Sequence, residues 1–197
     1  MINVVRADQV EADVRHGLAE IFAEGFTQWL GFFSKDPKKI AAAFAHIFIL
    51  DQFYVALYNG QVAGMAACTD GTSLSVKLDK KELRKHLGLY KGTLAGIFLK
   101  KEFESNFVRP EPGVGSIEFV GTATGFRGQG VASQLIRQII ERTPYKVYLI
   151  EEVADSNIPA MKLYYKLGFE EYKRRQIPDK RAKKIGINSV VSLRYNK

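Results

Sequence analysis

The chain has 197 residues, and its 46% hydrophobic and 25% charged residues are ordinary values for a globular protein that buries a core. No apolar run approaches the ~20 residues that span a bilayer, so we expect no membrane partner. The formal net charge of +8 predicts attraction to anions such as coenzyme A, nucleic acids and acidic metabolites.

Cysteine usage indicates a reducing compartment. Cys68 is the only cysteine, so no disulfide can form within the chain. It lies in an apolar run, and we interpret it as a small buried hydrophobe rather than a nucleophile. The first residues lack the charged stretch and apolar stretch of a signal peptide. We therefore expect a cytoplasmic protein that forms one domain over residues 1–197.

The N-terminal part of the chain predicts one strand and two helices. Residues 2–6 are strand-like, and apolar residues at helical spacing predict a helix over 10–23. The Asp36-Pro37 pair has the residue types of a helix N-cap and first position, which predicts a helix over 37–48. Between the two helices, the aromatic segment 25–34 is expected to break the first helix and pack on the core.

A β-hairpin is predicted next, followed by a helical segment. Strand-like residues 53–58 and 61–69 flank Asn59-Gly60, which suits a type I′ turn because both central residues need positive φ. Helices are then expected over 78–87, with Asp79 as a cap, and over 94–107. This segment is too apolar for a disordered linker.

The stretch from Ser116 to Phe169 carries the functional signal. Residues 117–122 form a short apolar run rich in β-branched residues, as in a buried strand. Apolar residues from Val131 to Ile140 recur at helical spacing. A glycine-rich turn joins them. The first N–H groups of a helix lack internal partners and carry partial positive charge, and glycines let a bulky ligand approach the backbone. This arrangement predicts a site for a diphosphate.

The C-terminal part predicts a mixed strand and helix pattern. A strand is expected over 145–153, and residues from Asp155 to Pro159 open a helix over 160–167 that ends at Gly168. Strands over 169–176 and 186–195 are expected to pair at the end of the sheet. A basic loop over 178–184 joins them.

The glycine spacing excludes two common phosphate-binding motifs. No lysine follows Gly130, as a P-loop requires, and the dinucleotide fingerprint is absent because the order is Gly125-x-x-Gly128-x-Gly130. The turn instead resembles the Arg/Gln-x-x-Gly-x-Gly/Ala signature of the GCN5-related N-acetyltransferase (GNAT) superfamily, with Arg127, Gly130 and Ala132 at the signature positions. Three further features match this family at the expected distances from the turn. They are the preceding strand, Asn157 and the run Leu163-Tyr164-x-x-x-Gly168-Phe169.

The resemblance implies a fold and a cofactor. The implied fold is a three-layer α+β arrangement with a mixed, largely antiparallel sheet flanked by helices. Residues 72–115 depart from the minimal family pattern, and we interpret them as a helical insertion, either a lid near the acceptor site or a packed elaboration. The aromatic segment 25–34 either packs on the core or walls the amine pocket. Acetyl-CoA is the expected co-substrate. Its predicted binding residues are Val120, Gly121, Thr122, Arg127, Gly128, Gln129, Gly130, Val131, Ala132, Ser133, Asn157 and Tyr164. Gly121 is expected to mark a bulge that parts two strands.

The resemblance also implies an acid and a base. At about pH 7.5 a lysine-type amine is neutral in roughly one molecule per thousand, so such an acceptor needs a base. Glu118 is the first candidate because the family often carries a base there, and alternation puts it on one face with Val120 and Thr122; the alternative is a solvent-facing glutamate. Glu152, on the next strand, is the second candidate. Tyr164, seven residues after Asn157, is the expected acid, or else a packed aromatic residue.

Other functional classes stay open at this stage. The chain could bind acetyl-CoA without turnover, as a regulator, or associate with RNA through Lys173 to Arg175 and the basic loop, although nucleic acid is the less favoured partner. A small-molecule or peptide amine is the expected acceptor, and a homodimer is allowed. The spacing of His16, His46 and His86 suggests no metal site.

Overall fold

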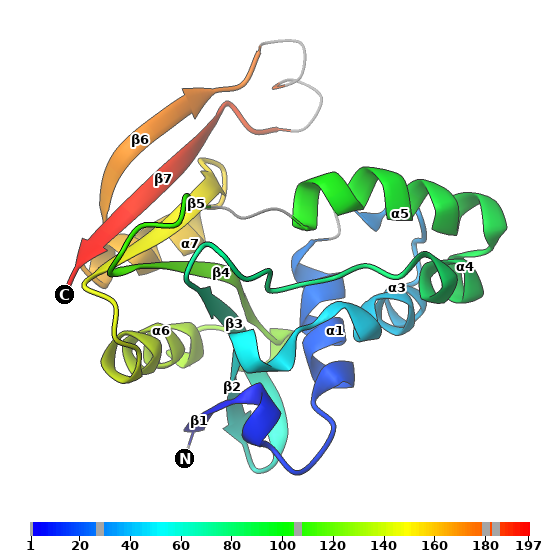
Figure 1. Ribbon diagram of the computed structural model, residues 1–197, viewed down its shortest axis with the longest axis horizontal. Coiled ribbons are helices and arrows are strands. Elements are labelled where there is room, and N and C mark those ends of the chain that lie inside the picture. Colours follow the sequence, from blue (N-terminus) through cyan, green and yellow to red (C-terminus); the bar gives the residue numbers. More distant parts are fainter. Residues whose placement is uncertain (1, 27–29, 105–107, 179–181, 183–185) are drawn as a thin grey trace.

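The protein is described from a computed structural model that covers residues 2–26, 30–104, 108–178, 182 and 186–197. A seven-stranded sheet in the order β1-β2-β3-β4-β5-β7-β6 forms its centre (Figure 1). All neighbouring strands are antiparallel except β4 and β5, which are parallel. The predicted mixed, largely antiparallel sheet is therefore confirmed.

The elements have the following bounds. The strands are β1 (Ile2–Arg6), β2 (Phe53–Tyr58), β3 (Gln61–Thr69), β4 (Val114–Thr122), β5 (Val147–Ala154), β6 (Glu170–Gln176) and β7 (Ser189–Asn196). The α-helices are α1 (Arg15–Gly25), α3 (Pro37–Phe44), α4 (Lys80–Leu87), α5 (Leu89–Phe103), α6 (Val131–Arg142) and α7 (Ile158–Lys166). Among the described residues, no helix is both long and apolar enough to cross a membrane.

Helices cover both faces of the sheet. Apolar residues of α6 and α7 pack against one face, where they form a buried cluster with β3, β5 and β7. Helices α1, α3, α4 and α5 supply a second cluster, rich in phenylalanine, against the other face. Figure 1 shows α6 and α1 on opposite sides of β3 and β4. This confirms the predicted three layers.

The N-terminal hairpin has the predicted bounds and turn. Asn59 and Gly60 both have positive φ, 49° and 78°, as a type I′ turn requires.

The Asp36 carboxylate accepts the Lys38 N–H at 2.9 Å, which confirms the predicted N-cap of α3. That helix ends at Phe44, and residues Ala45–Ile47 continue as a 3-10 turn.

Two predicted helices start well away from their predicted first residues, whereas α4 and α7 start within about one turn of theirs. The first begins at Arg15 rather than Val10, because Val10 is extended and the Asp13 carboxylate accepts the Arg15 N–H at 3.0 Å. The helix expected from residue 94 begins at Leu89. Its first turns contain glycines, which have low helix propensity but allow close packing. A Cβ on Gly92 would lie 2.5 Å from Arg84 Cα. Residues 105–107 lie outside the described part of the chain.

The segment over 72–115 is a packed helical hairpin. Leu83 of α4 and Ala95, Leu99 and Phe103 of α5 are buried in the phenylalanine-rich cluster. The carboxylate of Glu104 accepts the Leu78 N–H and lies 3.4 Å from the Lys100 ammonium, so the end of α5 is tied to the start of α4. These contacts favour the packed elaboration over a free lid.

The parallel strands β4 and β5 part after a short pairing. Their last paired residues are Ser116 and Leu149, although the strands continue to Thr122 and Ala154. Each strand bulges against its other neighbour beyond this point, with Phe119 and Val120 both opposite Ala66 on β3. The predicted parting of the strands is confirmed. The bulge lies at Phe119 and Val120, so its predicted position at Gly121 is wrong.

The C-terminal strands pair as predicted, with β7 placed between β5 and β6. Residues of β6 are exposed along its length, as expected of an edge strand. Of the predicted basic loop, Lys180, Arg181, Lys183 and Lys184 lie outside the described residues, as does Trp29 of the aromatic segment.

Candidate active site

The glycine turn leads into α6 with an uncapped helix N-terminus. Gly130 is the residue before the helix and has φ of 79°, and Gly128 has φ of 77°. A Cβ at either position would meet nothing within 4 Å, so glycine is needed here for its backbone conformation. No side chain in the described part of the structure caps the first turn. The N–H groups of Val131 to Ser133 therefore have no side-chain acceptor at the helix start, as a site for an anion requires.

An acidic residue of α1 is tied to this turn. Oε2 of Glu24 accepts the Thr124 hydroxyl at 2.7 Å and the Thr124 N–H at 3.2 Å. It also lies 3.5 Å from the Arg127 guanidinium, whose Nε donates to the Thr122 carbonyl at 3.2 Å. The Gln129 amide donates to the Gly125 carbonyl at 3.0 Å. Arg127 is thus held beside the turn.

The gap between β4 and β5 begins after Ser116 and reaches the same turn at its far end, where β4 ends at Thr122. Val120, Gly121 and Thr122 lie on β4 beyond the last β4–β5 pair, so their backbone groups on that side are not used by β5. Gly121 also lets α1 approach, because a Cβ there would lie 2.5 Å from Cγ2 of Ile21. An extended ligand arm can lie in such a gap as an additional strand.

Glu118 is buried at the start of this gap. Its side chain is 8% exposed, so the solvent-facing alternative is wrong. Oε1 accepts the Thr69 hydroxyl at 2.8 Å, and Oε2 accepts the Ser75 hydroxyl at 2.6 Å. Burial raises the pKa of Glu118, and the two hydroxyl donors oppose that rise.

The strand bulge changes which residues share a face with Glu118. Glu118 bonds to Ser75, which precedes the α4–α5 hairpin, and the next residue, Phe119, belongs to the phenylalanine-rich cluster. Val120 instead packs against the α6 cluster on the other face. The prediction that Glu118 and Val120 lie on one face is wrong, because the bulge adds a residue and reverses the alternation.

Tyr164 is buried on the α6 side of the sheet. It is 5% exposed and packs on Phe169, with ring centroids 6.1 Å apart. Burial raises the pKa of its phenol, which keeps the proton on the oxygen at neutral pH. No hydrogen bond joins the hydroxyl to another described residue. Glu118 and Tyr164 thus come from opposite faces of the sheet.

Comparison with models of known protein families identifies the family of this chain. The model of the acetyltransferase (GNAT) family matches residues 16–169, which include the turn, both parted strands, Glu118 and Tyr164. The chain belongs to the GNAT acetyltransferase family. The predicted family, enzyme class and acetyl-CoA co-substrate agree with this match.

Solved structures agree on the GNAT fold. An N-acetyltransferase from Staphylococcus aureus Mu50 is 18% identical with a TM-score of 0.60, and the match covers 99% of this chain and 100% of that one. A GCN5-related N-acetyltransferase from Kribbella flavida is 18% identical with a TM-score of 0.59, covering 100% and 98%. The YncA protein from Salmonella typhimurium, a putative acetyltransferase with its cofactor acetyl-CoA, is 13% identical with a TM-score of 0.57, covering 100% and 94%. A search of curated protein sequences finds no significant match.

Two further predicted site residues have partners within this GNAT domain. The Glu152 carboxylate is exposed and accepts the Arg175 guanidinium at 2.7 and 2.8 Å, so an ion pair already occupies it. Oδ1 of Asn157 accepts the Ala160 N–H at 3.3 Å and so caps α7. Its amide nitrogen donates no hydrogen bond to another described residue. Cys68 is buried, and burial raises the pKa of its thiol to about 12, which fits an inert core residue.

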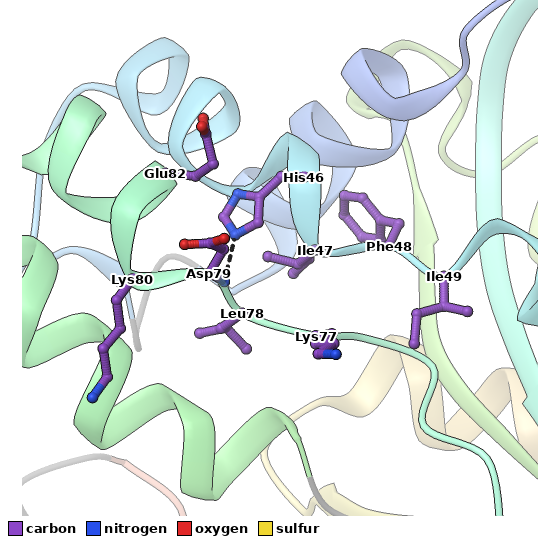
Figure 2. Close-up of a pocket in the computed structure, with 9 residues that line it drawn as sticks. All are labelled: His46, Ile47, Phe48, Ile49, Lys77, Leu78, Asp79, Lys80 and Glu82. Atoms are coloured by element: carbon purple, nitrogen blue, oxygen red, sulfur yellow. Dashed lines mark hydrogen bonds between the residues drawn. The ribbon is translucent and has the colours of Figure 1, made fainter.

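A cavity of about 520 Å³ lies on the helical side of the GNAT domain (Figure 2). It is bordered by Phe48, by His46 and by the start of α4, including Asp79 and Glu82. Nε2 of His46 accepts the Asp79 N–H at 2.9 Å. The glycine turn does not contribute to this cavity, so it is separate from the predicted cofactor site.

Sequence reasoning missed three residues of the site. Glu24 lies about a hundred residues from the turn it contacts, and nothing in its helix indicates that partner. Ser75 precedes a helix and has no motif around it. Thr69 is the polar end of the predicted strand 61–69, and it lies opposite Ser116, two residues before Glu118, only because β3 pairs with β4.

Proposed function

We propose that this GNAT protein is an acetyl-CoA-dependent N-acetyltransferase that transfers the acetyl group directly to a primary amine in a ternary complex. The observation that carries the proposal is the junction of the uncapped α6 N-terminus with the gap between β4 and β5. A pyrophosphate at the turn and an acyl-bearing arm in the gap fit the two features together.

The donor is bound mainly by backbone groups. Turn amides from Gly128 to Ser133 hold the pyrophosphate, with Arg127 and Gln129 beside them, and β4 backbone groups at Val120, Gly121 and Thr122 bond the arm. The amide of Asn157 contributes from the α7 side. Each charge–dipole contribution is only ~0.3–1 kcal/mol at an exposed site, so several bonds must act together.

The chemistry assigns a proton role to each face of the sheet. Glu118 takes a proton from the protonated amine, and the lone pair that this frees attacks the thioester carbon. As the carbon–sulfur bond breaks, Tyr164 gives its proton to the leaving sulfur. The nitrogen loses its second proton on forming the neutral amide, and through solvent this proton restores the tyrosine. Supporting this division, Glu118 is buried with the neutral hydroxyls of Thr69 and Ser75 as its hydrogen-bond partners, and burial raises the pKa of the Tyr164 phenol, so that it keeps its proton.

A thermal-shift titration with acetyl-CoA tests cofactor binding. Ligand linkage should raise the melting temperature with acetyl-CoA concentration. Gly130→Glu places a carboxylate in the anion site and should abolish the shift, and its circular dichroism checks that the protein still folds. No shift in the natural protein would contradict the proposal.

A thiol-release screen over amines then tests turnover. A shift with acetyl-CoA but no thiol release across lysine, polyamine, aminoglycoside and peptide acceptors would favour the alternative of a binding protein without turnover.

The basic strand β6 adds no support for RNA binding, because Arg174 forms an ion pair with Glu171 and Arg175 forms one with Glu152.

A further inference from the structure

Helix α5 is apolar on two opposite faces. One face, which includes Leu99 and Phe103, is buried in the phenylalanine-rich cluster. The other face meets solvent, where Tyr90 is 75% exposed, Ile97 54% and Phe98 62%. A helix that is apolar all round is normally buried on every side. In the described structure, the outer face of α5 therefore lacks the covering that its residue types favour.

The exposed apolar side chains gather into one surface. Five of the nine large hydrophobic side chains that are exposed among the described residues lie here, and we call them the outer α5 surface. They are Phe32, Leu89, Tyr90, Ile97 and Phe98. The Lys91 ammonium donates to the Phe33 carbonyl at 3.1 Å, which ties the turn of Phe32 to the start of α5. Apolar patches of this kind mark interaction sites.

Cations surround the outer α5 surface. The α4–α5 hairpin, residues 80–104, contains seven lysine and arginine residues and three glutamates, so it carries +4 of the formal net charge of +8. Lys101 is exposed one helical turn beyond Ile97, on the same side of α5. Neither Lys101 nor Lys91 forms an ion pair with another described residue. Figure 1 shows this basic and apolar hairpin at one end of the molecule, away from α6.

Charge and shape decide what covers this surface. A second copy in a symmetric dimer would present the same surface, so that cations would meet cations. A protein partner would need an acidic groove shaped to a convex helix, whereas a fluid layer of lipid headgroups needs no matching shape. Exposed aromatic and aliphatic residues with lysines beside them are typical of helices that lie in the interface of an anionic membrane. There the ammonium groups meet lipid phosphates, and the apolar side chains enter the acyl boundary.

We propose that the outer α5 surface binds the surface of an anionic phospholipid membrane. Tyr90, Ile97 and Phe98 enter the headgroup layer, and the lysines of the α4–α5 hairpin pair with phosphates. Such peripheral contact needs no membrane-spanning segment, so it differs from the mode that the short apolar runs exclude. The inference concerns only this hairpin and the turn of Phe32, and it does not depend on the proposed acetyltransferase function.

Cosedimentation of the full chain with vesicles tests the inference. The protein should pellet with vesicles of phosphatidylglycerol and phosphatidylcholine in equal parts, and it should stay in solution with phosphatidylcholine alone. Added salt should weaken the binding, because it screens the ionic contribution. Failure to bind the anionic vesicles at low salt would overturn the inference.

Matched variants test whether this surface is the one that binds. Ile97→Ser should lower the vesicle affinity about fivefold, since part of an apolar side chain no longer leaves water. Ile158→Ser is its control, because Ile158 is 53% exposed on α7, and it should change nothing. The melting temperature of each variant checks its folding. Equal affinities in the two variants would overturn the assignment to α5.

A pair of lysine variants separates this surface from the net charge of the chain. Lys101→Glu and Lys173→Glu lower the net charge equally, but Lys173 is exposed on β6, outside the hairpin. Lys101→Glu should therefore lower the affinity about tenfold or more, and Lys173→Glu far less. An equal loss in both variants would show a diffuse charge effect and overturn the assignment.

Two other results would give the surface a different partner and overturn the lipid proposal. A dimer in sedimentation equilibrium that Ile97→Ser dissociates would assign the surface to a second copy of the chain. Retention on immobilised polyglutamate without binding to anionic vesicles would assign it to an acidic protein.

Discussion

Phe119 on β4 and Glu152 on β5 have the same unusual backbone conformation on opposite sides of one gap. Their φ values are 51° and 57°, and both residues lie in bulges. Positive φ costs about 1–3 kcal/mol for such residues. The two bulges bend the strands away from each other, so the parting of β4 and β5 is built into the backbone before any ligand binds.

Gly121 is where the bulged strand meets α1, and its replacement should destabilise the fold. A Cβ would lie 2.5 Å from Cγ2 of Ile21, in a tightly packed region. Gly121→Ala should lower the free energy of unfolding by about 1–3 kcal/mol through overpacking. Gly125→Ala is the matched control, because a Cβ there meets nothing within 4 Å. Urea unfolding of both variants is the measurement, and equal stability would show that α1 moves aside.

Glu24 should weaken cofactor binding by its charge. Its carboxylate lies 3.5 Å from the Arg127 guanidinium and next to the predicted pyrophosphate site. Glu24→Gln keeps an oxygen for Thr124 but removes the charge, so acetyl-CoA should bind about two- to fivefold tighter at low salt. Glu24→Ala also loses the bonds to Thr124 and serves as the comparison. Isothermal titration at two salt concentrations measures the effect, and weaker binding by Glu24→Gln would contradict it.

Much of this fold could be predicted from local residue chemistry. The Asn59-Gly60 turn, the Asp36 and Asp79 caps and the glycine turn each specify their own backbone geometry. The start of α5 could not be predicted in this way. Gly92 lies there because it allows α5 to pack closely on α4, and that is a tertiary contact.

The site was harder to predict than the fold, for a related reason. Period-two alternation placed Glu118 and Val120 on one face, but a bulge that depends on pairing with β3 reversed it. The hydroxyl of Ser75 reaches Glu118 across 43 positions of sequence. Such a contact exists only once the sheet and its neighbouring segments have assembled.

Tyr164 should matter for chemistry and little for cofactor binding. If it protonates the leaving sulfur, Tyr164→Phe should lower kcat at least tenfold, since general acid catalysis is typically worth ~10²–10⁴-fold. Its ring packing on Phe169 should survive, so the acetyl-CoA thermal shift should stay. Tyr165→Phe is the matched control, because Tyr165 is 46% exposed on the same helix. A fall below threefold in Tyr164→Phe would leave this tyrosine a packing residue.

His46 should make the fold less stable in mild acid. Burial lowers its pKa below the ordinary value of 6.5, and its Nε2 accepts the Asp79 N–H at the start of α4 (Figure 2). Between the folded and unfolded pKa values the unfolded chain binds more protons, so this contribution to the free energy of unfolding is present above pH 6.5. It is lost as the pH falls through the folded value.

A variant that keeps the acceptor without the titration isolates this effect. The side-chain oxygen of His46→Gln can accept the Asp79 N–H and stays uncharged, so this variant should lose less stability than the natural protein between pH 7.5 and pH 5. Urea unfolding at the two pH values gives both differences, and subtraction removes the carboxylates that titrate in both proteins. The nearby carboxylates of Glu82 and Asp79 favour the charged imidazole. If these carboxylates outweighed the burial of His46, the natural protein would lose no more stability than His46→Gln between the two pH values, which would contradict the prediction.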